Sequence, residues 1–438
     1  MNRLARVIGL SHATALVVGT IIGASVFVQA SEITARVPTT AGVVLAWLLA
    51  GGLTLLGAQV CAELASAYPR TGGVYVFLRE VYTPALGFLW GWAMFWSMHS
   101  GIAAAVATVF ARYAGTFLSL GDTGTRLLAV GAILFLSAIN YAGTRTGSRF
   151  QAAITGVKLA AVVAIVAAGW WMAPAAPPPV AAGAVAEWGL TGLMLAVSAG
   201  LFAFGGWHMV TYTAEETVNA SRTIPRALML GIAVVTICYV GLNAVYLSVL
   251  SVPEVVASSR VAADTFDRLV GPAGAVAIAA LVMVSAFGAL NGIILVGPRV
   301  YYQMAQDGLL FRWAGAVHPR FQTPARAIVL QAAWSSVLVW TGTYRALFTR
   351  VIYTEWIFFA LLGVAVLLLR RRPGYDPPWP MPLVPVAPLV FVFASAAIVV
   401  NQLIADPRES AIGLGLVLSG LPVYWLWSRL RQGSGGQA

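Results

Sequence analysis

Charged residues are scarce in this sequence. Asp, Glu, Lys and Arg make up 9% of the 438 residues, whereas hydrophobic residues make up 60%. A soluble globular domain carries about 25% charged residues. This shortage, together with a mean hydropathy of +0.84, excludes a soluble domain and indicates a polytopic membrane protein.

Cysteines and catalytic motifs are also missing or few. The only two cysteines, Cys61 and Cys238, fall within apolar runs, so the sequence offers no disulfide framework. It contains no H-E-x-x-H zinc motif, no G-x-S-x-G nucleophile elbow, no phosphate-binding loop and no pair of intramembrane aspartates. These absences argue against a membrane-embedded enzyme and predict neither a cofactor nor a metal site.

Long apolar runs predict an all-α protein with twelve membrane spans, because about 20 apolar residues cross a bilayer as a helix. The runs lie at about 13–35, 41–67, 84–118, 127–143, 150–173, 190–214, 227–250, 272–306, 324–342, 351–369, 383–404 and 410–428. If the N-terminus is inside, most arginines lie on the cytoplasmic side, which predicts cytoplasmic termini in a plasma (inner) membrane. The net charge of +11 then reflects topology and attraction to anionic lipids, not nucleic-acid binding.

The first apolar run contains small residues where a spanning helix is normally uninterrupted. It reads V-G-T-I-I-G-A-S-V-F from Val18 to Phe27, with glycines at positions 19 and 23. Glycine and other small residues make a break in the helix inexpensive, and broken backbone at membrane depth is tolerated only beside a cavity or inside protein. The same spacing is also a helix-packing motif, so close packing of two helices is an alternative interpretation.

A second interruption lies in the sixth run, where F-A-F-G-G-W-H spans Phe202 to His208. Glycine-interrupted segments at corresponding places in two halves of a chain are typical of a secondary-transporter binding site. Runs one to five and six to ten each open with such a segment. An odd repeat of five spans predicts that the two halves have inverted topology.

Two ionisable residues stand inside predicted spans. Lys158, the only lysine, lies about eight residues, or ~12 Å, from the cytoplasmic end of its span. An ionisable group at this depth predicts a functional role. Glu63 lies one to two turns from the end of its span, and we expect it to pair with an arginine or with backbone near the interface.

Several motifs resemble those of the amino acid, polyamine and organocation transporter superfamily. The first run resembles that superfamily's first-helix signature, and F-A-F-G-G-W resembles that of its L-amino acid transporter branch. The likeness continues in C-A-E-L-A-S-A-Y-P-R-T-G-G, E-E-T-V-N-A-S-R-T-I-P and N-G-I-I-L-V-G-P-R-V-Y-Y-Q-M-A-Q-D-G-L-L, and covers residues 10–372. It implies a five-plus-five inverted-repeat core over 1–372, with repeats at about 10–173 and 190–372. Two further helices at 373–430 and a polar tail at 431–438 follow.

The resemblance implies a substrate site at the two breaks. An amino acid carboxylate would bind N–H groups exposed at the start of the outer half-helix, and its ammonium would face carbonyls at the end of the inner half-helix. Phe202 corresponds to the family's aromatic gate, whereas His208 and Glu355 depart from the family pattern and affect side-chain specificity. The predicted substrate-binding residues are Thr20, Ile21, Ile22, Gly23, Ala24, Ser25, Val26, Phe202, Ala203, Phe204, Gly205, His208 and Glu355.

Lys158 corresponds to a lysine that replaces the sodium ion in several sodium-independent relatives. The resemblance implies that Lys158 and Ser285 couple the first helix to the fifth and eighth. It predicts a sodium-independent exchanger of neutral L-amino acids, with a proton-coupled symporter, or a membrane sensor without turnover, as alternatives. No cysteine occurs in the loop after the third span, so no disulfide-linked accessory subunit is expected. The oligomeric state stays open.

Overall fold

The computed structural model describes residues 4–23, 25–172 and 188–434. All named elements are helical; η1 is a π-helix, and η2 and η3 are 3-10 helices. In chain order they are α1 Leu10–Ile21, α2 Ser25–Arg36, α3 Thr40–Ala67, α4 Val74–Val81, α5 Pro84–Ala93, η1 Met94–Met98, α6 His99–Ala114, α7 Asp122–Tyr141, α8 Thr144–Met172, α9 Leu190–Ala203, η2 Trp207–Glu216, α10 Ala220–Val249, α11 Val252–Ala257, α12 Val261–Val270, α13 Pro272–Val296, α14 Pro298–Gln306, η3 Arg312–Gly315, α15 Ala325–Thr341, α16 Tyr344–Leu369, α17 Val386–Ala405, α18 Pro407–Leu418 and α19 Gly420–Ser434.

Within the described residues, ten helical segments are long and apolar enough to cross a membrane. The predicted first span is instead divided into α1 and α2, of 12 residues each. The predicted span at 324–342 is α15, which has 17 residues. These pieces are shorter than the roughly 20 residues of a simple span. The chain is therefore a multi-pass membrane protein, and the count of twelve stays a prediction.

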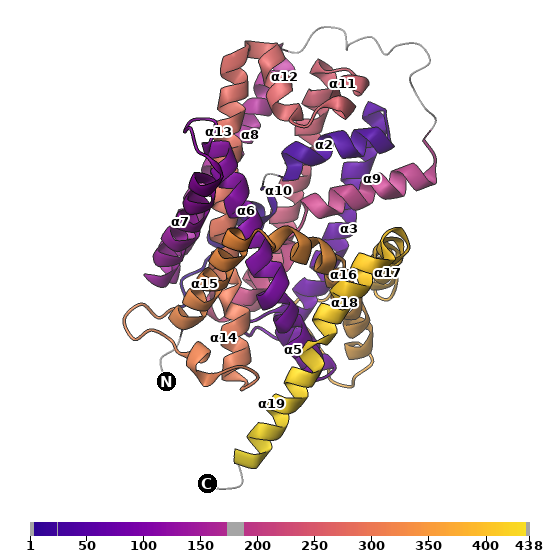
Figure 1. Ribbon diagram of the computed structural model, residues 1–438. Helices are drawn as coiled ribbons and strands as arrows, with labels where there is room; N and C mark the ends of the chain where they lie inside the picture. The colour runs from indigo at the N-terminus through magenta and orange to yellow at the C-terminus, as the bar shows by residue number, and fades with distance from the viewer. Residues whose placement is uncertain (1–3, 24, 173–187, 435–438) are drawn as a thin grey trace.

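Helix α1 lies inside the bundle, where it packs against α8, α10, α13 and η2. Every residue from Leu16 to Ile21 is buried, as expected for a predominantly apolar stretch of helix enclosed by other helices. Figure 1 shows α11 and α12 at the upper end of the bundle and α14 and α19 at the lower end. Helices α17 and α18 pack along α16 at one side.

The third predicted span, 84–118, has a more complex structure than a single helix. It begins where predicted, because Thr83 Oγ1 accepts the Leu86 N–H at 3.2 Å and proline follows at the first helical position. The π-helix η1 then separates α5 from α6.

The short helices α11 and α12, between α10 and α13, were not predicted because neither resembles an apolar span.

The prediction for Glu63 is confirmed. Its carboxylate accepts hydrogen bonds from Arg370 at 2.9 and 2.7 Å and from the Met381 backbone N–H at 2.7 Å. Glu63 is buried, whereas the Arg370 side chain keeps 30% of its surface exposed. The pair therefore ties α3 to the end of α16 and to the segment that leads into α17.

Candidate functional site

The first break separates α1 from α2. Helix α1 ends at Ile21 and α2 begins at Ser25, so the interruption falls within the predicted segment. The Gly23 N–H turns back to the Ile21 carbonyl at 2.8 Å. Ala24, a predicted substrate-binding residue, lies outside the described residues.

The two glycines of the first segment have different roles: Gly19 fits the helix-packing interpretation, and Gly23 fits the helix-break interpretation. Gly19 lies inside α1, where an added Cβ would collide with the side chains of Gln151 and Thr155 on α8. Gly23 lies in the break, and the nearest side-chain atom to an added Cβ is the Ala289 Cβ at 3.8 Å. Gly19 therefore permits close helix packing, while Gly23 lies where the helix stops.

The second break follows α9, which ends at Ala203 before η2 begins at Trp207. Gly206 has φ = 93°, a left-handed conformation that glycine adopts with little strain. A Cβ at this position would stand 3.6 Å from the Thr20 carbonyl oxygen. The backbones of the two breaks thus approach each other closely.

A cavity of about 340 Å³ lies beside both breaks. Helices α2, α6, α13 and α16 complete its wall. Of the predicted substrate-binding residues, it brings together Thr20, Ile21, Gly23, Ser25, Phe202, Ala203, Gly205 and Glu355. It also includes Gln29, Ile102, Ala105, Val106, Val109, Gly206, Met209, Ala289, Ile293 and Ile352, which were not predicted.

Four predicted residues that the structure describes lie outside this cavity, namely Ile22, Val26, Phe204 and His208. The Ile22 carbonyl already accepts hydrogen bonds from Lys158 and Ser285, so it faces the opposite side of the break. Val26 is completely buried and does not reach the lining. Phe204 is also buried and packs against Trp47 and Tyr239. Sequence position alone did not show which way each residue turns where the helix ends.

Lys158 binds the broken end of α1. Its Nζ donates to the Gly19 carbonyl at 3.1 Å and to the Ile22 carbonyl at 2.9 Å. Ser285 on α13 donates to the Ile22 carbonyl at 3.1 Å and lies 3.3 Å from the Gly23 carbonyl. Helix α8 starts at Thr144, earlier than the predicted 150, so Lys158 lies roughly 20 Å along the helix rather than ~12 Å. Lys158 is completely buried at this depth.

Tyr239 joins the two breaks and was missed by the sequence reasoning. Its hydroxyl lies 3.1 Å from the Ile21 carbonyl oxygen and 3.1 Å from the Ala203 carbonyl oxygen. These carbonyls belong to the last residues of α1 and α9. Nothing in the apolar run around Tyr239 distinguishes it from a packing aromatic, so only the tertiary structure reveals this bridge.

A second, lateral cavity of about 190 Å³ adjoins the first between α9, η2, α16 and α17. The two linings share Phe202, Gly205, Gly206, Ile352 and Glu355. Further polar side chains line only the lateral cavity, namely Ser198, His208, Tyr353, Asn401 and Gln402. His208, predicted to bind substrate, therefore belongs to the lateral cavity and not to the main one.

Glu355 lies near the middle of α16 and is 8% exposed. Its Oε1 has no hydrogen-bond partner, and the carboxylate forms no ion pair among the described residues. The ring nitrogens of His208 likewise have no partner in the part of the chain that the structure describes. The His208 ring is surrounded by Trp90, Tyr212 and Phe359.

The arrangement of two broken helices around a cavity agrees with the comparison of the sequence with protein families. Residues 8–425 match the model described as "Amino acid permease". The chain belongs to the amino acid permease family. This family is part of the amino acid, polyamine and organocation superfamily that the motifs resemble. The permease has the family's all-helical, multi-pass character.

Several similar proteins are amino acid transporters by name. The permease is 32% identical over 428 residues to the serine/threonine exchanger SteT of Bacillus subtilis (strain 168), covering 97% of each chain. It is 29% identical to the human Asc-type amino acid transporter 1 over 434 residues, which is 97% of the permease and 82% of that protein. It is 28% identical to the human b(0,+)-type amino acid transporter 1 over 438 residues, covering 98% and 89%. The family and these relatives are transporters rather than enzymes.

A buried ion pair lies at another point of the permease and was also missed. Arg299 on α14 binds Glu216 at the end of η2 through bonds of 2.7 and 2.8 Å, and both side chains are completely buried. The Thr144 hydroxyl donates to Glu216 at 2.5 Å. The Glu216 carbonyl accepts the N–H groups of Val7 and Ile8, each at 2.9 Å. Glu216 thus connects the N-terminal segment, α8, η2 and α14.

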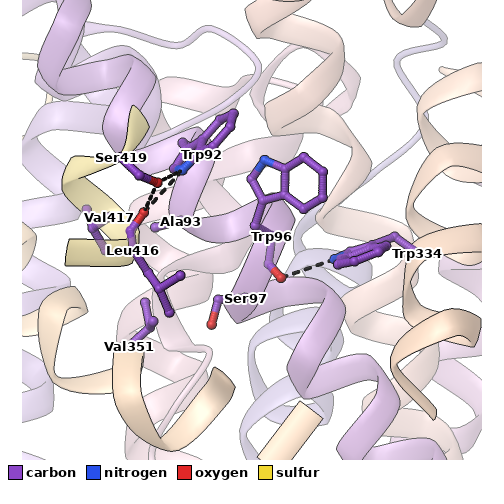
Figure 2. A pocket seen from close by; sticks show the side chains of 9 residues that line it. All are labelled: Trp92, Ala93, Trp96, Ser97, Trp334, Val351, Leu416, Val417 and Ser419. Atoms are coloured by element: carbon purple, nitrogen blue, oxygen red, sulfur yellow. Dashed lines mark hydrogen bonds between the residues drawn. The ribbon is translucent and has the colours of Figure 1, made fainter. Parts of the chain in front are cut away.

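A separate apolar cavity of about 320 Å³ lies among α5, η1, α15, α16 and α18. Figure 2 shows the Trp92 indole directed at the Leu416 carbonyl and Ser419, and Trp334 directed at the Trp96 carbonyl. The corresponding distances are 3.2, 3.3 and 3.1 Å. Its lining includes none of the predicted site residues, so it is not part of the candidate site.

Proposed function

We propose that this permease is a secondary transporter of neutral L-amino acids that works by alternating access, as a sodium-independent exchanger. The observation that carries the proposal is the cavity at two facing helix breaks. The proposed architecture has twelve spans, with inverted repeats at about 10–173 and 190–372. Helices α17 to α19 then form the two additional spans of 373–430, followed by the polar tail at 431–438. The termini are cytoplasmic in a plasma (inner) membrane.

The two ends of the substrate fit the two kinds of helix end. The N-terminus of α2, at Ser25, carries partial positive charge and free N–H groups for a carboxylate. The C-terminal ends of α1 and α9, at Ile21 and Ala203, carry partial negative charge for an ammonium. All three residues line the main cavity. Main-chain groups therefore recognise the parts that every amino acid shares.

Phe202 is suited to act as the gate over the substrate. It lines both cavities and is 45% exposed, although it lies within a membrane-spanning segment. An aromatic ring in this place can cover a bound amino acid when α9 moves. Glu355 and His208 would then act on the substrate side chain.

Sodium independence is supported by the contacts of Lys158. A sodium ion would be held by backbone carbonyls and hydroxyls, and the Lys158 ammonium occupies such a position at the carbonyls of Gly19 and Ile22. Two roles are open to the Lys158 ammonium. It is either a permanently charged group that holds α1 in place, or a titrating group that releases α1 when it loses its proton. We favour the permanently charged group, because two carbonyls at 3.1 and 2.9 Å stabilise the charged form.

Two alternatives have specific support. A proton-coupled symporter is favoured by Glu355, whose buried Oε1 has no hydrogen-bond partner among the described residues. A sensor that binds amino acids without turnover would use the same cavity, but relatives named as exchangers and transporters favour turnover. Cys61 and Cys238 are both buried and free, which supports the proposal that no accessory subunit is disulfide-linked to them.

The test is counterflow in proteoliposomes containing the purified permease. Liposomes loaded with one neutral L-amino acid should accumulate a labelled one from outside, and replacing sodium by choline should not change the rate. Methyl esters and N-acetyl derivatives should compete weakly, because each removes one charged end. Stoichiometric binding without flux would favour a sensor, and strong sodium dependence would contradict the proposed role of Lys158.

A further inference from the structure

Among the described residues, the linings of the two cavities contain a single carboxylate and neither an arginine nor a lysine. That carboxylate belongs to Glu355. Glu355 is buried, with 8% of its surface exposed. An ionised carboxylate in the middle of a membrane helix is energetically costly unless a proton or an opposite charge neutralises it.

The described residues around Glu355 do not supply that opposite charge. Among the side chains that the structure describes on α16 and just beyond its end, Arg350 pairs with Glu409, and Arg370 pairs with Glu63. On α4, Arg79 pairs with Glu80 and Asp307. The titratable groups that face this part of α16 include Tyr353 and His208, which share the lateral cavity with Glu355, and Tyr212 on η2, which interacts electrostatically with Glu355.

Lys158 cannot serve as the partner either. Its ammonium donates to Gly19 and Ile22, on the side of the first break away from the main cavity, and it does not line either cavity. The missing charge must therefore arrive from outside the protein. The two sources that reach the cavity are a proton from water and a cationic group on the substrate.

We infer that Glu355 is the charge-balancing group of the substrate cavity: it carries a proton when the bound amino acid is neutral and pairs with the side chain when that amino acid is cationic. The inference rests on the proposed amino acid transport and extends its substrate class to basic amino acids. In both loaded states, Glu355 together with its proton or with the cationic side chain has a net charge of zero. A neutral amino acid moves together with one proton, taken up from one aqueous phase and released to the other, whereas a basic amino acid moves without one.

Exchange of unlike substrates then has a distinct signature. When an external basic amino acid enters and an internal neutral one leaves, the neutral one takes a proton with it, so one positive charge moves in each direction. Exchange is electroneutral, yet the lumen becomes alkaline. Exchange of two neutral amino acids moves protons equally both ways and leaves the luminal pH unchanged.

The experiment uses proteoliposomes that enclose a pH-sensitive dye and L-serine or L-alanine. External L-lysine and L-ornithine should drive release of the neutral amino acid and raise the luminal pH, with about one proton exported per lysine imported. External serine should drive release without a pH change. Lysine exchange without a pH change, or no lysine exchange while neutral exchange runs, would overturn the inference alone; absence of neutral exchange would sink the proposed function as well.

Substitutions test the residue. In Glu355→Gln, the neutral exchange that is measured should no longer depend on pH, and competition by lysine should weaken by at least about ten-fold relative to competition by serine. Glu32→Gln is the matched control, because Glu32 is 55% exposed and pairs with Arg36 on the surface of α2. If Glu355→Gln fails to fold, the dye measurement on the unaltered permease still decides. Unchanged lysine competition in a folded Glu355→Gln variant would refute the assignment.

Discussion

Replacing Lys158 by methionine tests the tie between α8 and the first break. Methionine has a similar length and no donor, so Lys158→Met removes the bonds to Gly19 and Ile22 while keeping most of the packing. Each hydrogen bond from a charged donor contributes about 1.5–3 kcal/mol. Loss of both hydrogen bonds destabilises the ordered conformation of the break by at least about 3 kcal/mol. The population of that conformation then falls by about 100-fold.

Global stability should respond differently from transport. Burying an ammonium costs several kcal/mol, so an apolar replacement recovers much of what the lost bonds contributed. The melting temperature of Lys158→Met in detergent should therefore stay close to that of the unaltered permease. The initial rate of counterflow should fall by about 100-fold, because it depends on the geometry of the break and not on overall stability.

A neighbouring residue provides the control. The Thr155 hydroxyl donates to the Ala15 carbonyl at 3.1 Å, one turn earlier on α8 and away from the break. Thr155→Val removes a neutral bond of about 0.5–1.5 kcal/mol and should slow counterflow by less than about ten-fold. The reasoning is refuted if Lys158→Met keeps nearly full activity, or if both variants lose activity equally.

Three further predictions concern other residues. Ser25→Ala should weaken substrate affinity by about ten-fold or more, because a hydroxyl bond to a carboxylate contributes about 1.5–3 kcal/mol; an unchanged apparent affinity in counterflow would contradict the ligand role. Arg299→Met should destabilise the permease by about 3–5 kcal/mol, because it leaves the buried Glu216 unpaired, and thermal unfolding in detergent should show a clearly lower midpoint. The hydrogen bond from Arg268 lowers the pKa of Glu254 to about 2, so its contribution to stability is present above its ordinary value near ~4.3 and is lost as the pH falls toward 2. The difference in melting temperature between the unaltered permease and Glu254→Gln should shrink from pH 6 to pH 3; a constant difference would contradict this.

The positions of the two breaks could be predicted from sequence because they depend on local properties. Gly23 and the glycine pair at 205–206 weaken the helix wherever they occur in an apolar run, and the observed helix ends fall beside them. The location of Lys158 inside the membrane could also be predicted, since a lysine within an apolar run has few other interpretations. Its helix, however, starts earlier than predicted because Thr144 and the polar residues after it do not resemble a membrane span.

Contacts between distant residues could not be predicted in this way. Whether the Ile22 carbonyl faces the cavity or Lys158 depends on the turn that the chain makes after α1, and the sequence does not encode that turn in any visible pattern. The Glu216 and Arg299 pair joins residues far apart in the chain, and each occurs in a motif that the resemblance had covered without assigning it a partner. His208 and its neighbour Trp207 both line the lateral cavity and not the main one, and nothing in the sequence distinguishes the two cavities.

The Tyr239 hydroxyl has one proton and faces two carbonyl oxygens at equal distance, those of Ile21 and Ala203. A phenol donates one hydrogen bond at a time, and the Ile21 carbonyl also accepts the Gly23 N–H at 2.8 Å, so at this junction the Tyr239 proton cannot serve both carbonyls together. Both residues line the main cavity, and an ammonium brings three donors. A substrate whose ammonium binds here completes the hydrogen bonding of both helix ends at once, so an occupied junction holds α1 and α9 together more firmly than an empty one.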